Sequence, residues 1–212
     1  MAKTIKKHFV LDIDDTLTDS YEFNQQMFVD TFIPHLDLTN LETKKFVRDV
    51  HYHGRGSSMR AQFEAVIKHF SLNLDAHELV KQNEALHIEN VDKIRVFDAV
   101  EDLIKHITDS GRKVYICTNR QTESATKIIK NNNLEKYFTE VISCIDDGHE
   151  KPDPHCLTDL VQRSGDSKDT FIYFGDSKTD YQFATNAGVD CIIVDHYLNQ
   201  KKFYKMLMES FI

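Results

Sequence analysis

Short apolar runs recur along the chain, and most are followed by a segment with helical spacing. The runs are rich in β-branched or aromatic residues, which is typical of strands that are buried on both faces. Their alternation with helical patterns predicts an α/β fold, in which a parallel sheet is joined by crossover helices. The expected strands are Phe9-Val10-Leu11, Val114-Tyr115-Ile116-Cys117, Val141-Ile142-Ser143, Phe171-Ile172-Tyr173-Phe174 and Cys191-Ile192-Ile193-Val194.

Residues typical of helix ends separate these strands. Residues 100–107 carry apolar side chains at helical spacing, and Gly111 lies just past their expected end. Asp153-Pro154 predicts an N-cap followed by proline in the first helical position. Ser177 is expected to cap the next helix, which Gly188 would close.

Residues 20–92 have a different pattern, without a strand-length apolar run. Met59, Phe63, Val66, Ile67 and Phe70 form a helical stripe. The stretches 21–33, 41–50 and 77–88 are also expected to be helices. We therefore predict two domains, a sheet-containing core of residues 1–19 and 93–212 and an inserted all-helical domain of residues 20–92.

Composition limits the classes of function. The formal net charge of -8 argues against a nucleic-acid surface and favours a small substrate held by local positive groups. No apolar run approaches the length that spans a bilayer, and no signal peptide is visible, so we expect a cytoplasmic protein without membrane partners. The four cysteines form no CxxC pair and are expected to be buried thiols.

A dense acidic cluster follows the first expected strand. Asp12, Asp14 and Asp15 lie within four residues, where like charges repel one another. A fold tolerates such a cluster when something positive, usually a divalent cation, lies among the carboxylates. Open α/β sheets place their ligands at the carboxyl ends of their strands, where this cluster stands.

Other polar residues follow the later strands. Thr118-Asn119-Arg120 comes after the second, Lys151 after the third at some distance, and Asp176 and Asp180 after the fourth. Because parallel strand ends converge on one edge, these residues are expected to form a single site. Several carboxylates, one hydroxyl with nearby backbone N–H groups and one lysine suit a phosphate monoester and a magnesium ion.

These strand ends resemble the four motifs of the haloacid dehalogenase superfamily, in the family's order and over the whole chain. The matching residues are Asp12-Ile-Asp14-Asp-Thr16, Thr118-Asn119, Lys151-Pro152 and Gly175-Asp176-x-x-x-Asp180. The helical insert resembles the C1 cap of phosphoglycolate phosphatases and β-phosphoglucomutase. The resemblance implies a Rossmann-like core, an inserted cap and a magnesium-dependent phosphatase acting on a small phosphorylated metabolite.

The same resemblance implies a role for each matching residue. Asp12 would be the nucleophile that forms an aspartyl-phosphate. Asp14 would protonate the leaving oxygen and then activate water, with a pKa above that of its neighbour. The Thr118 hydroxyl and the Asn119 backbone would hold the phosphoryl oxygens. Lys151 would neutralise the charge around nucleophile and phosphate.

The metal and the cap also receive expected residues from the resemblance. Mg²⁺ would bind the carboxylates of Asp12 and Asp176 and the backbone carbonyl of Asp14. Asp180 would orient this shell rather than bind the metal. Arg55 lies in the Gly-rich turn of the insert, close to where C1 caps carry a substrate-contacting loop, and is a candidate substrate-binding residue.

Several questions stay open at this level. A sugar-phosphate mutase would share every core residue and differ only in whether water or sugar accepts the phosphoryl group. A non-catalytic phosphoryl-binding or signalling protein is a further alternative. A receiver domain would place its phosphoacceptor at the third strand, before the threonine, whereas here Asp176 and Asp180 follow Lys151. The oligomeric state is expected to be monomer or homodimer. Asp15 departs from the glycine usual in phosphoglycolate phosphatase-like members, and the role of Arg120 is undecided.

Overall fold

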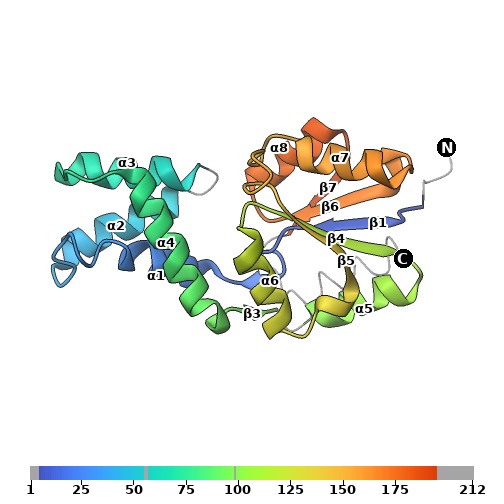
Figure 1. Cartoon of the computed structure of the whole chain (residues 1–212), viewed down its shortest axis with the longest axis horizontal. Helices are drawn as coiled ribbons and strands as arrows, with labels where there is room; N and C mark the ends of the chain where they lie inside the picture. The colour runs from blue at the N-terminus through green and yellow to red at the C-terminus, as the bar shows by residue number, and fades with distance from the viewer. Residues whose placement is uncertain (1–4, 55–56, 98, 195–212) are drawn as a thin grey trace. The chain divides into compact units, whose positions relative to one another are not determined.

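A five-stranded parallel sheet in the order β5-β4-β1-β6-β7 forms the core of one unit of the computed structural model, which confirms the predicted α/β class (Figure 1). The structure describes residues 5–54, 57–97 and 99–194. The strands are β1 (His8–Leu11), β4 (Lys113–Thr118), β5 (Phe138–Ser143), β6 (Phe171–Gly175) and β7 (Asp190–Ile193).

The register of the sheet aligns the ends of its central strands. Leu11, the last residue of β1, pairs with Ile116 of β4 on one side and with Phe174 of β6 on the other. All four residues of β1 are buried, because the strand is paired on both edges and covered on both faces. The residues that follow β1, β4 and β6 therefore emerge along one edge of the sheet, as the sequence predicts.

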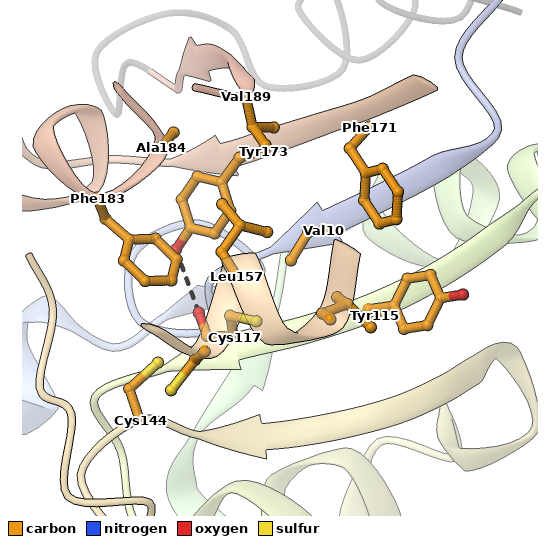
Figure 2. Packing of buried hydrophobic residues seen from close by; sticks show 12 residues of the cluster. Val10, Tyr115, Cys117, Cys144, Leu157, Phe171, Tyr173, Phe183, Ala184 and Val189 are labelled. Atoms are coloured by element: carbon orange, nitrogen blue, oxygen red, sulfur yellow. Dashed lines mark hydrogen bonds between the residues drawn. The ribbon is translucent and has the colours of Figure 1, made fainter. Parts of the chain in front are cut away.

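Helices cover both faces of the sheet, with α5 and α6 on one face and α7 and α8 on the other (Figure 1). Their bounds are α5 (Val100–Asp109), α6 (Thr122–Asn131), α7 (His155–Ser164) and α8 (Lys178–Ala187), and single 3₁₀ turns occur at η2 (Glu135–Tyr137) and η3 (Lys168–Thr170). Leu157 and Phe183 of the second pair pack against Val10 and Tyr173 of the sheet in one buried cluster (Figure 2).

The helix ends follow the predicted signals with one shift. Gly111 and Gly188 adopt the left-handed backbone conformation just past α5 and α8. Ser177 caps α8 in a reciprocal capping box with Asp180. The helix α7 begins at His155, one residue later than predicted, because Asp153 accepts a hydrogen bond from the His155 N–H and Pro154 takes the cap position.

Contacts divide the chain into two compact units, Met1–Asp19 with Ile94–Ile212 and Ser20–Lys93. The second unit contains α1 (Tyr21–Asp30), α2 (Leu41–His53), α3 (Met59–Phe70), α4 (Ala76–Asn90) and the 3₁₀ turn η1 (Val91–Lys93), and its described residues contain no strand. It has its own core, in which Phe28 stacks on Phe63 and contacts Phe32 edge to face. Among described residues, no helix is long and apolar enough to cross a membrane.

A short antiparallel pair stands where the chain leaves and re-enters the sheet-containing unit. The strands β2 (Thr18–Asp19) and β3 (Arg95–Val96) pair with each other, and the Phe97 N–H donates to the Leu17 carbonyl at 3.0 Å. Sequence patterns did not predict this pair, because two residues are too few for alternation to be recognised.

Candidate active site

The acidic segment after β1 forms a tight turn around one carbonyl group. The Ile13 carbonyl accepts hydrogen bonds from the backbone N–H groups of Leu17 and Thr18, at 2.9 and 3.1 Å. The Asp12 N–H donates to the Phe174 carbonyl at 2.9 Å, which ties the start of the turn to β6. Asp15 occupies the left-handed region at φ 55°, the conformation for which glycine is best suited.

Lys151 is a buried cation between two carboxylates. Its Nζ lies 3.0 Å from Asp12 Oδ1 and 2.7 Å from Asp180 Oδ1, and its side chain is 3% exposed. It also donates to the Tyr173 hydroxyl at 2.9 Å. Burial lowers the pKa of Lys151, but the attraction of Asp12 and Asp180 outweighs that effect and raises the pKa overall. The ammonium group is therefore fixed in position and stays charged.

Asp12 has an unsatisfied buried oxygen. Its Oδ1 forms an ion pair with the Lys151 Nζ at 3.0 Å but accepts no hydrogen bond, and the hydrogen bonds of that ammonium group go to Asp180, Tyr173 and the carbonyl of Cys117. Burial raises the pKa of Asp12 to about 8 against the opposing attraction of Lys151, and nearby carboxylates add to the rise. An oxygen left in this state is suited to an electrophilic or cationic partner.

Asp180 has both carboxylate oxygens engaged. Oδ1 accepts hydrogen bonds from Lys151 and Tyr173, and Oδ2 accepts from the Ser177 N–H and hydroxyl. Burial alone would raise the pKa of Asp180, but Lys151 and the other donors lower it. Gly175 makes room for this arrangement, since a Cβ there would lie 2.3 Å from the Asp180 Cβ.

Three carboxylates form a candidate metal centre. Oxygen atoms of Asp12, Asp176 and Asp180 all lie within 4.8 Å of one another. Hard oxygen donors of this kind suit Mg²⁺. The donors fit such an ion at Asp12 and Asp176, because Asp12 has an unsatisfied oxygen whereas both Asp180 oxygens already accept hydrogen bonds.

Residues at the end of β4 and just after it support the site through backbone contacts. Thr118 is buried, and its hydroxyl accepts the Arg120 N–H at 3.1 Å. The Asn119 side chain clamps the Lys151 backbone, accepting its N–H at 2.8 Å and donating to its carbonyl at 3.3 Å. The resemblance implied a role for the Asn119 backbone only, and nothing in the sequence indicates the partner of its side chain.

Tyr173 belongs to the site although the sequence places it in a core strand. Its hydroxyl lies 2.9 Å from Asp180 Oδ1 and accepts a hydrogen bond from the Lys151 Nζ at 2.9 Å. It also donates to the Cys117 carbonyl at 3.1 Å, the contact drawn as a dashed line in Figure 2. Burial raises its pKa well above the ordinary value for tyrosine, so the hydroxyl keeps its proton. A tyrosine in an apolar strand gives no sequence signal for such a role.

The Asp14 side chain pairs with Arg120. The Arg120 Nε and Nη2 donate to its two oxygens at 3.0 and 2.6 Å. The sequence left the role of Arg120 undecided, and this contact supplies its partner. Arg55, the candidate cap residue, lies outside the described residues.

Comparisons with known proteins agree on one family. The family model described as haloacid dehalogenase-like hydrolase matches residues 9–194. A phosphoglycolate phosphatase from Mesorhizobium japonicum is 27% identical over 191 residues, which cover 88% of this chain and 81% of that protein. Pyrophosphatase PpaX from Halalkalibacterium halodurans is 25% identical over 132 residues, 62% of this chain and 60% of that protein.

Solved structures share the fold at low sequence identity. A predicted phosphoglycolate phosphatase from Haemophilus somnus 129pt superposes with a TM-score of 0.76 at 18% identity, covering 98% of this chain and 99% of that one. CbbY from Rhodobacter sphaeroides, in complex with phosphate, superposes with a TM-score of 0.72 at 14% identity, covering 90% and 87%. At these identities the likeness concerns the fold alone.

Proposed function

Because the chain belongs to the haloacid dehalogenase-like hydrolases, we propose that it is a magnesium-dependent phosphatase that forms an aspartyl-phosphate on Asp12. Its phosphatase-named relatives support the coarser statement that it is a phosphoric monoester hydrolase. The observation that carries the finer proposal is the buried Asp12 oxygen that accepts no hydrogen bond and lies 3.0 Å from the fixed Lys151 ammonium group.

The first chemical step would transfer the phosphoryl group to Asp12. A carboxylate oxygen of Asp12 attacks phosphorus, the bond from phosphorus to the ester oxygen breaks, and Asp14 gives its proton to the leaving oxygen. Lys151 stabilises the negative charge on the transferring group, because its position is set before the substrate binds.

The second step would return the enzyme to its starting state. Asp14, now a carboxylate, takes a proton from water while the water oxygen attacks phosphorus. The bond from phosphorus to the Asp12 oxygen breaks and inorganic phosphate leaves. Asp14 is therefore proton donor in the first step and proton acceptor in the second.

We assign the metal to Asp12 and Asp176, with Asp180 as the residue that positions Lys151. A bound Mg²⁺ would supply charge that favours the carboxylate form of Asp12 and neutralises the phosphate oxygens. The Asp14 carbonyl stays a predicted ligand from the family resemblance. A cytoplasmic location, the cap role of the helical unit, and a monomeric or homodimeric state also stay predictions.

The substrate class is a small phosphorylated metabolite. The names of the relatives include phosphoglycolate and pyrophosphate as substrates, and we extend to this chain only their shared chemistry, a phosphate group on a small molecule. The transfer of the group to a sugar, as in a mutase, is supported by no particular contact among the described residues.

The test is phosphate release by the purified full chain. With Mg²⁺ the protein should release inorganic phosphate from p-nitrophenyl phosphate, and both EDTA and Asp12→Asn should abolish release. Circular dichroism on the Asp12→Asn variant checks that the fold is retained. Release that persists in that variant or in EDTA would disprove the mechanism, and transfer of phosphate to an added sugar would favour the mutase.

A further inference from the structure

One edge of the Arg120 guanidinium group donates hydrogen bonds to both oxygens of the Asp14 carboxylate. Arg120 Nε donates to Oδ2 at 3.0 Å and Nη2 donates to Oδ1 at 2.6 Å. A two-point pair of this kind fixes the plane of a carboxylate more strictly than a single-point ion pair does. We propose that Arg120 is a positioning residue that holds Asp14 as the proton acceptor for hydrolysis of the aspartyl-phosphate, an inference that rests on the proposed function.

Arg120 is itself held in place by neighbouring elements. Its side chain is 5% exposed, and its Nη1 donates to the Ser124 hydroxyl of α6 at 2.8 Å. Its backbone N–H donates to the Thr118 hydroxyl at the end of β4. Since β4 and α6 determine where the guanidinium group lies, these two elements help to set the orientation of the Asp14 carboxylate.

The Asp14 side chain has reason to need this support. It is 28% exposed, and a half-buried aspartate that is held less firmly samples several rotamers. A proton acceptor must lie within about 3 Å of the water that it deprotonates. Once its proton has passed to the leaving oxygen, Asp14 is the group that accepts a proton when water attacks phosphorus and the bond to Asp12 breaks, so its position decides whether it can reach that water.

The rate of phosphoenzyme hydrolysis tests this role. We would mix the full-length enzyme and Mg²⁺ with p-nitrophenyl phosphate, whose leaving group departs without a proton, and quench in acid to count phosphoenzyme. Arg120→Ala should slow phosphoenzyme decay by about 100-fold, with formation almost unchanged. Nitrophenolate should then appear in a burst equal to the enzyme concentration.

Two variants show whether the effect of Arg120→Ala comes from the two-point geometry, from the lost charge or from a general loss of stability. Arg120→Lys keeps the charge but loses the fork, so its decay rate should lie between those of wild type and Arg120→Ala. Arg163→Ala is the matched control, because Arg163 also makes a two-point pair, with Glu140, on the exposed surface of α7. Its decay rate should equal that of wild type.

A double variant shows whether Arg120 acts through Asp14. In an Asp14→Asn background, Arg120→Ala should slow decay no further, because the carboxylate it positions is already absent. If Arg120→Ala instead slows phosphoenzyme formation and gives no nitrophenolate burst, Arg120 acts on the phosphoryl group and the proposal is overturned. A phosphoenzyme decay rate in Arg120→Lys equal to that of wild type would also overturn it. A wild-type enzyme that forms no phosphoenzyme would instead refute the proposed function.

Discussion

Gly175→Ala is expected to damage the site from beneath. A Cβ at this position would lie 2.3 Å from Asp180 Cβ and 2.4 Å from its Cγ, far closer than such atoms approach. Asp180 cannot swing aside cheaply, because its oxygens are bonded to Lys151, Tyr173 and Ser177 and the side chain is 2% exposed. Either α8 moves away from the sheet, or the Asp180 carboxylate separates from Lys151.

The two responses set the expected magnitude. Overpacking that preserves the ion pair costs about 1–3 kcal/mol, and separating a buried pair costs about 3–5 kcal/mol. We therefore expect Gly175→Ala to lower the free energy of unfolding by about 3 kcal/mol, and kcat for phosphate release by more than about 10-fold because Lys151 loses its fixed position. Urea unfolding followed by circular dichroism and a phosphate-release assay measure the two effects.

A matched glycine and a double variant make the test specific. Gly165→Ala adds the same methyl group, but nothing lies within 4 Å of the new Cβ. It should lower the free energy of unfolding only by the strain of an alanine in the left-handed conformation, about 1–2 kcal/mol, and leave kcat unchanged. In an Asp180→Gly background, Gly175→Ala should cost little more, because the Asp180 Cβ, Cγ and Oδ2 with which the new methyl group clashes are all removed. Equal costs for both glycines, or full additivity in the double variant, would refute this reasoning.

Three further outcomes are expected from the described contacts. Asp15→Gly should be more stable than Asp15→Ala by about 1 kcal/mol in urea unfolding, because both lose the carboxylate but only glycine suits φ 55°. Hydrogen bonds from Lys7 and then His8 lower the pKa of Asp166, so the stability that this carboxylate contributes is present above about pH 4 and is lost as pH falls through the lowered pKa. The difference in melting temperature between wild type and Asp166→Asn should therefore shrink below about pH 4. Magnesium at about 100 times its Kd should stabilise the wild type by about 2.7 kcal/mol and leave the melting temperature of Asp176→Asn unchanged, and an equal shift in both would remove Asp176 from the metal site.

The fold was predictable because its strands are short, apolar and buried on both faces. All five sheet strands coincide with the predicted runs to within a few residues, and the residues after three of them meet at one edge. Strand order along the sheet and the two-residue pair β2–β3 were not predicted, since both depend on contacts between distant segments. The helices of residues 20–92 were predictable because their apolar residues recur at helical spacing over several turns.

The site was predictable only as far as residues follow strand ends. Asp12, Lys151 and Asp180 are brought together as the motif spacing implied. Tyr173 was not predicted, because a strand residue with an apolar ring gives the same pattern whether or not its hydroxyl has a polar partner. The side-chain role of Asn119 was missed for a related reason, since its partner is the backbone of a residue 32 positions later in the sequence.

The contacts around Lys151 explain why these unpredicted residues matter. Its ammonium group is held by a carbonyl from β4, a hydroxyl from β6 and a carboxylate from α8, while Asn119 holds its backbone. A lysine on a loop would otherwise sample many rotamers and would have to be ordered during the reaction. Because three elements fix the charge beforehand, stabilisation of a phosphoryl group costs no reorganisation when the reaction occurs. The charge itself is visible in the sequence, whereas its fixed position depends on the folded sheet.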